Sequence, residues 1–142
     1  MNTQLNSESP LNFKATLTYA NGLPSLIELV TEELKKEGFG VLTRIDFHEK
    51  IKEKLGHNMN PVVILGACMP QAAYQAYQMS TDVTALMPCN AVIRELNPGQ
   101  YSLELTKPSF MLQAIPHSEN LKQMACDLDD KISRVIKSVA RL

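Results

Sequence analysis

Hydrophobic residues recur along this chain with two different periods, and the period changes at turn residues. Residues 11–19 alternate apolar and polar positions, which is typical of a strand with one buried face. Residues 25–37 instead place their leucine, isoleucine and valine side chains on one helical stripe, which ends at Gly38. Residues 39–45 return to a strand pattern. The first third of the chain therefore predicts strand, helix and strand.

The alternation continues through the middle of the chain. Asp46 and Glu49 resemble a capping box, and the helix that follows, up to Gly56, has an apolar edge that we expect to be buried. This edge consists of Phe47, Ile51 and Leu55. Residues 61–67 form a continuous apolar run, as in a strand buried on both faces. A helix then begins at Pro70, and residues 82–86 predict a short helical turn.

The last third predicts a hairpin and a long helix. Residues 91–95 and 101–107 are strand-like, and Asn97-Pro98-Gly99 between them is a strong hairpin signal. One apolar stripe runs from residue 121 to residue 139, with Ser118 placed as the helix cap.

The predicted element order is β-α-β-α-β-α-β-β-α. We expect a single two-layer α+β domain over residues 11–142, with a mixed, mostly antiparallel sheet and helices packed against it. Residues 1–10 are polar and are expected to be a flexible N-terminal lead-in.

Composition narrows the classes of partner. The chain has 142 residues, of which 44% are hydrophobic, and its 14 basic and 15 acidic side chains give a net charge near −1. Such a charge provides no field for a nucleic-acid backbone or an anionic membrane, so neither partner is expected. Residues 62–69 are too short an apolar stretch to span a bilayer. The start of the chain does not resemble a signal peptide, and three cysteines are an odd number, so we expect a soluble cytoplasmic protein with reduced thiols.

Cys68 is the first candidate for chemistry. It ends the apolar strand two residues before Pro70, so it lies at or beside a helix N-terminus. That position stabilises a thiolate and lowers the pKa of an exposed cysteine. Gly66 leaves room for a ligand or a second stretch of backbone. The plainer alternative, that Cys68 is a small hydrophobic residue at a strand end, is favoured.

Cys89 is the second candidate, and it follows Pro88 and precedes Asn90 at the start of a predicted strand. If strands 62–67 and 91–95 are neighbours, Cys68 and Cys89 lie at the same end of the sheet. A soft metal ion or a reversible disulfide would suit that arrangement. The spacing lacks a metal-knuckle pattern, so no metal site is assigned, and a site formed with one histidine stays an alternative.

Other side chains are weaker candidates. Arg44 and Arg94 lie within predicted strands, where a charged group needs a partner or a ligand anion. Tyr74, Tyr77 and Met79 line a pocket beside Cys68 or, more commonly at helical spacing, belong to the core. Cys126 is assigned to packing.

Three segments together resemble the domain of unknown function 302 family. They are EGFGVLTRIDFHEKIKEKLG (37–56), PVVILGACMPQAAYQA (61–76) and MPCNAVIRE (87–95). The resemblance implies a small α+β protein that can dimerise. The family's ACxP and PCN segments match Cys68, Pro70, Cys89 and Asn90 here. The family brings with it no established reaction, substrate or cofactor, so no cofactor is assigned.

Two functions of different class follow. The first is a non-enzymatic binding or interaction module, expected to be a homodimer, with a site for a small ligand or metal near Cys68 and Cys89. The second is a thiol-based redox or sulfur-transfer protein, with Cys68 as nucleophile and Cys89 as resolving or co-ligating thiol. The first is favoured because no general-base motif or cofactor signature accompanies the cysteines.

Overall fold

Six strands form one sheet in the computed structural model, which describes residues 3–6 and 10–141. The strand order is β1-β2-β6-β5-β4-β3, and every neighbouring pair is antiparallel. The strands are β1 (Thr3–Asn6), β2 (Asn12–Thr18), β3 (Gly40–Asp46), β4 (Val62–Cys68), β5 (Cys89–Asn97) and β6 (Gln100–Thr106). With helices packed against it, this sheet confirms the predicted α+β class.

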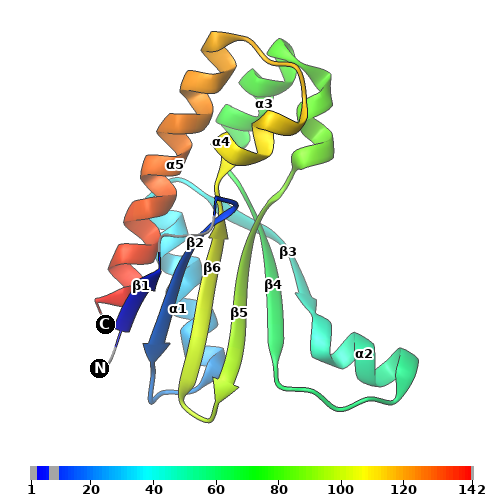
Figure 1. The fold of residues 1–142 in the computed structure, drawn as a ribbon, viewed down its shortest axis with the longest axis vertical. Coiled ribbons are helices and arrows are strands. Elements are labelled where there is room, and N and C mark those ends of the chain that lie inside the picture. Colours follow the sequence, from blue (N-terminus) through cyan, green and yellow to red (C-terminus); the bar gives the residue numbers. More distant parts are fainter. Residues whose placement is uncertain (1–2, 7–9, 142) are drawn as a thin grey trace.

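The sheet is wholly antiparallel and not mixed, because of where its connecting helices lie. The helix between β3 and β4, α2 (Phe47–Leu55), lies beyond one end of these strands and does not cross a face of the sheet (Figure 1). The helix after β4, α3 (Pro70–Met79), lies beyond the opposite end. The chain therefore re-enters the sheet from the end that it has just left, and each new strand runs opposite to its neighbour.

The N-terminal segment differs from its prediction. Thr3–Asn6 form β1, which pairs with β2 from Thr3 opposite Leu17 to Asn6 opposite Lys14. No strand was predicted within the lead-in over residues 1–10, and residues 1–2 and 7–9 lie outside the described part. The polar composition of the segment hid an edge strand, since an edge strand needs backbone pairing on one side only.

The helices form two groups. On one face of the sheet lie α1 (Leu23–Lys36) and the C-terminal half of α5 (Glu119–Ala140) (Figure 1). Above the end of the sheet lie α3, the N-terminal half of α5 and the short helices η1 (Thr81–Leu86), α4 (Pro108–Met111) and η2 (Leu112–Ala114). Within the described residues, no helix has the length and apolar character that a membrane crossing needs. The predicted cap of α5 is confirmed: the Ser118 side chain accepts a hydrogen bond from the Leu121 N–H, at 3.2 Å.

The buried side chains divide in the same way. The main core joins the sheet to α1 and α5, and its largest fully buried side chains include Leu26, Leu34, Leu65, Ile93, Leu103 and Ile136. A second, smaller group, which we call the cap cluster, joins the helices above the sheet. The cap cluster consists of Ala76, Val83, Leu112, Leu121 and Ala125, with Met87, Ile115 and Met124 packed against them.

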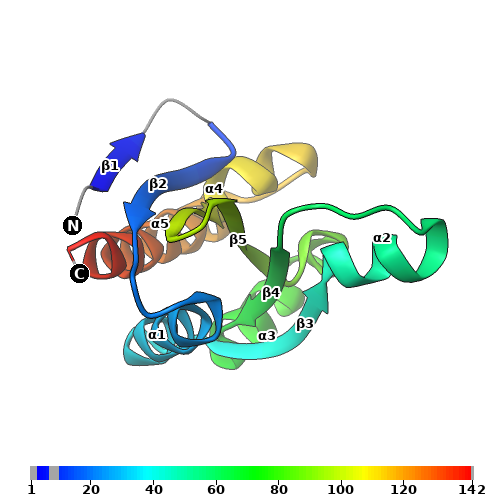
Figure 2. The same ribbon diagram turned by 90° about the horizontal axis from the view of Figure 1, so that it is seen from below.

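The position of α2 contradicts the sequence prediction. None of its nine residues is buried, and Phe47 and Leu55 are 38% and 63% exposed. Figure 2 shows α2 projecting away from the sheet and the other helices. The predicted capping box at the start of α2 is also wrong. The Asp46 side chain makes no cap hydrogen bond and instead forms an ion pair with Arg44, at 3.0 Å. The apolar edge of α2 is real, but the described part of this chain buries none of its residues completely and leaves Phe47 and Leu55 exposed.

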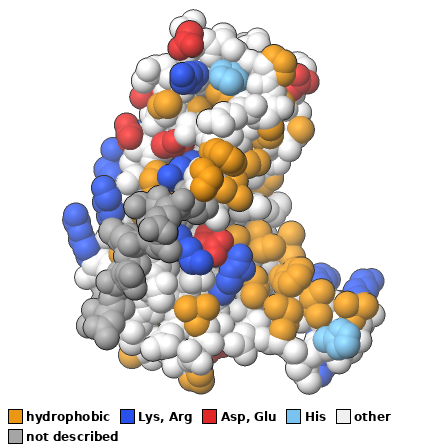
Figure 3. Space-filling view, viewed as in Figure 1, with side chains coloured by type: hydrophobic (Ala, Val, Ile, Leu, Met, Phe, Trp, Pro, Cys, Tyr) orange, Lys and Arg blue, Asp and Glu red, His pale blue; other side chains and the backbone are white. Residues whose placement is uncertain are grey.

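The sheet face opposite α1 and α5 has two unlike halves. Strand register places Ile45, Ile64 and Val92 side by side across β3, β4 and β5. The same row continues into Glu104 on β6 and Lys14 on β2. Figure 3 shows the hydrophobic side chains gathered on the β3–β4 side of this face, toward α2, and the charged ones beside them.

Candidate functional site at the end of the sheet

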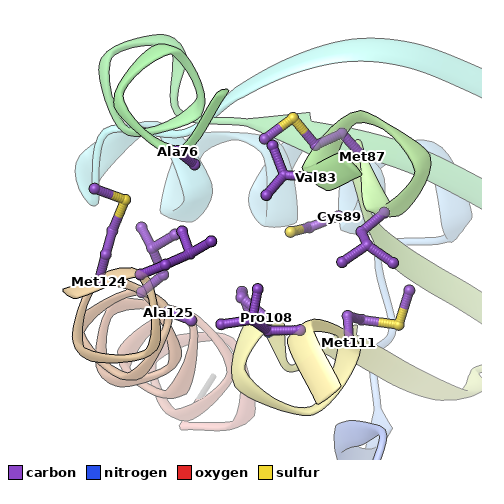
Figure 4. Close-up of a pocket in the computed structure, with 12 residues that line it drawn as sticks. Ala76, Val83, Met87, Cys89, Pro108, Met111, Met124 and Ala125 are labelled. Carbon is purple, nitrogen blue, oxygen red and sulfur yellow. The ribbon is translucent and has the colours of Figure 1, made fainter. Parts of the chain in front are cut away.

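The cap cluster lines a cavity of about 90 Å³ at the end of the sheet (Figure 4). Its lining comes from α3, η1, the start of β5, α4, η2 and α5, and contains no charged side chain. The lining residues are Ala76, Val83, Leu86, Met87, Cys89, Pro108, Met111, Leu112, Leu121, Met124, Ala125 and Leu128. The space is therefore an apolar chamber between helices, a common location for small-molecule sites.

The cavity exists because α3 presents its small residues inward. Ala76 is its one buried residue, and Ala72 and Ala73 are partly buried beside it. The large residues of α3 face solvent: Tyr74 is 65% exposed, and Tyr77 and Met79 are about half exposed. Both expectations for these three side chains, pocket lining and core, are therefore wrong. A helix that packs through alanine methyl groups leaves space that leucine side chains would fill.

Two further cavities adjoin the first. One, of about 60 Å³, lies between α3 and the ends of β4 and β5, and both Cys68 and Cys89 line it. The other, of about 10 Å³, reaches toward the main core past Phe39 and Ala67. Cys89 lines all three spaces. In Figure 4 the thiol of Cys89 points into the first of these cavities, so this residue lies where the three adjoin.

The two predicted cysteines do meet at one end of the sheet. Cys89 pairs with Ala67 in the β4–β5 register, and Cys68 is the next residue of β4. This confirms that the two strands are neighbours. Because successive side chains of a strand point to opposite faces, Cys68 and Cys89 start from opposite faces of the sheet. Both are free thiols, as is Cys126, which lines none of these three cavities.

Burial controls the acidity of both thiols. It raises the pKa of Cys68, although Met69 caps the helix that follows and Pro70 begins it. Burial also raises the pKa of Cys89 from 9.0 to about 11, with smaller contributions from Cys68 and from the Asp129 carboxylate. The prediction that the helix start lowers the pKa of Cys68 is therefore wrong. It assumed an exposed thiol, and partial burial disfavours the charged thiolate.

The other predicted site residues have partners within this chain. Arg94 makes two hydrogen bonds to Glu104, at 3.3 and 3.2 Å, and Arg44 pairs with Asp46. Neither arginine lines any of the three cavities. Both therefore balance charge on the sheet surface.

Gly66 and Asn90 face each other across β4 and β5. A β-carbon on Gly66 would lie 2.7 Å from Cγ of Pro88 and would collide with Oγ1 of Thr43. The close approach expected at Gly66 is thus made by this chain's own Pro88. Asn90 is exposed, lines the smallest cavity, and accepts a hydrogen bond from Thr106 Oγ1 through its carbonyl, at 3.2 Å.

A metal centre has no basis in the side chains that the structure describes. Residues 3–6 and 10–141 contain no group of three His, Cys, Asp or Glu side chains arranged to hold an ion. The two larger cavities offer sulfur but no carboxylate or imidazole. The alternative of Cys68, Cys89 and one histidine is not formed.

Sequence reasoning missed much of the cavity wall. Met111, Leu112 and Pro108 belong to α4 and η2, a segment for which no element was predicted. Met124 and Ala125 were placed on α5, but nothing indicated that they would face a space. The one available signal was the alanine-rich start of α3, because three small residues on one helix face leave room against larger neighbours.

Comparisons with known proteins identify a family and a solved structure whose descriptions name no reaction. The family model described as "Domain of unknown function DUF302" matches residues 14–139. A solved structure, "Crystal structure of uncharacterized conserved protein DUF302 from Bacillus stearothermophilus", is 29% identical, with a TM-score of 0.78. The similarity covers 91% of this chain and 98% of that one. Comparison with curated proteins finds no match.

Proposed function

Since the chain belongs to the DUF302 family, whose description names no function, we propose one from its cavities: a non-enzymatic binding module for a small apolar ligand. The ligand occupies the chamber within the cap cluster, against Cys89. The observation that carries this proposal is the apolar cavity of about 90 Å³, lined by side chains of which none is charged.

The energetics favour an apolar ligand at this site. Moving apolar surface out of water contributes roughly 25 cal/mol per Å². An apolar cavity between aliphatic side chains holds water poorly and accepts apolar molecules instead. The methionines at its wall, Met87, Met111 and Met124, have flexible thioether side chains that adapt to different shapes.

Thiol chemistry is the weaker function for the same site. A cysteine nucleophile acts as thiolate, and burial holds the pKa of Cys89 at about 11 and raises that of Cys68. Both groups are then protonated near neutral pH. The two thiols also begin on opposite faces of the sheet, which does not favour a direct disulfide between them.

The proposal is tested by ligand-induced stabilisation. A ligand that binds only the folded state raises Tm with its concentration. We expect millimolar n-hexanol to raise the Tm of the wild-type chain. Ala125→Leu fills the chamber and abolishes this rise, while Met79→Leu, on the exposed side of α3, keeps it. Equal responses of wild type and Ala125→Leu would contradict the proposal.

The unpartnered surface supports a homodimer. The apolar edge of α2 continues into the row of Ile45, Ile64 and Val92 on the open sheet face. A two-fold dimer uses the same patch on both subunits, so a projecting helix and an apolar sheet face on one chain complement each other. The start of α2 is held in place, because Nδ1 of His48 accepts a hydrogen bond from the Val62 N–H, at 3.1 Å. A second copy is the occupant that buries both surfaces.

Sedimentation velocity tests this dimer. The wild type is expected to sediment as a dimer at micromolar concentration and Leu55→Glu as a monomer, because the new carboxylate would be buried without a partner. Tyr74→Glu, an equally exposed position on α3, is the matched control and should stay dimeric. A monomeric wild type would refute the dimer.

We propose that the protein is located in the cytoplasm. Three free cysteines agree with a reducing, cytoplasmic compartment.

A further inference from the structure

The two larger cavities are neighbours with a common wall. The cavity of about 90 Å³ and that of about 60 Å³ share Ala76, Met87, Cys89 and Leu128. One extends from this wall between η1, α4 and α5, and the other extends under α3 to Cys68 and Phe39. The two cavities therefore lie on either side of these four residues.

From this shape we infer that the ligand is a linear aliphatic chain that passes Cys89 and occupies both cavities. The inference rests on the function proposed above and names its ligand class. An apolar cavity that accepts benzene measures about 150 Å³. Each cavity here is smaller, so either one would bury a compact ring less completely. A chain one methylene wide uses both volumes, because it needs little width where it passes the shared wall.

The shared wall can admit such a chain. Ala76 and Cys89 have small side chains, and Met87 has three rotatable bonds and a polarisable thioether that fits irregular gaps. Rotation of the Met87 side chain widens the passage without moving the backbone. Leu128 is the one branched side chain in the wall.

The lining also fixes where a polar group of the ligand lies. None of the residues that line the two cavities is charged. A polar group buried without a hydrogen bond is strongly disfavoured, so a head group stays in solvent at the mouth while the alkyl chain enters. The ligand class is therefore a single-chain amphiphile bound through its chain.

Calorimetric titration with straight-chain alcohols from propanol to decanol, and with benzyl alcohol as the compact probe, tests the inference. Each added methylene should lower Kd about fourfold until both cavities are filled, after which Kd becomes constant. Benzyl alcohol should bind more weakly than hexanol. A Kd that stops improving at butanol, or a benzyl alcohol that binds as tightly as hexanol, would overturn the linear chain and leave the apolar binding site intact.

Two variants change the junction in opposite directions. Ala76→Leu places a larger side chain at the shared wall, so the gain beyond butanol should disappear while propanol still binds. Met87→Ala widens the passage, so the dependence on chain length should extend to longer alcohols. Met79→Leu, outside both cavities, is the control and should match the wild type. If wild-type protein binds neither straight-chain nor aromatic alcohols, the proposed function itself fails.

Discussion

The main core and the cap cluster are built from the same kinds of residue but packed to different degrees. In the main core, leucine, isoleucine and valine side chains from the sheet meet those of α1 and α5, and Leu103 and Ile93 are fully buried. In the cap cluster, two of the five buried residues, Ala76 and Ala125, are alanines, and a cavity remains between them. The difference lies in side-chain size and not in polarity.

This comparison indicates which part of the molecule is available for binding. Protein interiors are normally packed as densely as organic crystals, so a void represents lost contacts. The main core supplies most of the buried packing of the fold, whereas the cap cluster is less tightly packed and leaves a cavity. The residue at the boundary is Cys89, whose strand belongs to the sheet and whose side chain faces the chamber.

The largest expected effect is the loss of stability when a buried leucine in each region is shortened to alanine. Leu103→Ala, in the main core, should lower the free energy of unfolding by about 4 kcal/mol, because it opens a cavity where neighbours are fixed. Leu121→Ala, at the chamber wall, should cost about 2 kcal/mol, since its side chain already has an empty side. Urea unfolding measures both. Equal losses would mean that the cap cluster is packed like the main core.

The next effect concerns alkaline pH. Below pH 9.0 the Cys89 thiol is protonated in both folded and unfolded chains, so its contribution to stability is complete. Between 9.0 and about 11 the unfolded chain loses this proton while the folded chain keeps it, and stability falls with rising pH. The expected loss is about 3 kcal/mol.

The free energy of unfolding, measured from roughly pH 8 to 11.5, checks this dependence, because thiols titrate in this range. Cys89→Ala should lose less stability over this range than the wild type, whereas Cys126→Ala should follow the wild type. A wild type and Cys89→Ala that fall in parallel would show that Cys89 ionises at an ordinary pKa, as an exposed thiol does.

The smallest expected effect is the change in stability when an alanine is enlarged to leucine, and it has opposite signs in the two regions. Ala125→Leu adds methyl and methylene groups to the chamber and should stabilise the fold by about 1 kcal/mol. Ala15→Leu adds the same groups to a fully buried position on β2 and should destabilise it by about 2 kcal/mol. Thermal unfolding compares the pair. A destabilised Ala125→Leu would indicate a chamber already filled.

Much of the fold was predictable because its signals are local. The alternation over residues 11–19 became β2, the apolar run at 61–67 became β4, and Ser118 caps α5. The resemblance in the cysteine segments also indicated the family correctly.

The wrong predictions share a cause. Each concerns the burial of a side chain, which depends on the segments that pack against it and not on the local sequence. The stripe of α2 predicted burial, but the described chain buries none of its residues completely. Tyr74 and Tyr77 have the spacing of a buried face, yet α3 turns its alanines inward. The thiol of Cys68 begins next to a helix but is partly buried, which reverses the direction of its pKa shift.

The shape of the cavity was not predictable from the sequence. A void is the space that remains after helices from distant segments pack together, and the alanines at the start of α3 were its one local signal. The sequence did single out Cys89, as part of a small-ligand or metal site near Cys68 or, in the alternative, as a resolving or co-ligating thiol. In the structure the same residue matters for its position between three cavities.

The central claim, that the chamber of the cap cluster binds an apolar ligand, is tested most directly by NMR of protein labelled at its methionine methyl groups. Met87, Met111 and Met124 line the chamber, while Met59 and Met79 are exposed elsewhere. During titration with n-hexanol, the first three signals should shift together along one saturating curve and the other two should stay in place. Equal shifts at Met59 and Met79, or no shift at the three chamber methionines, would contradict the account.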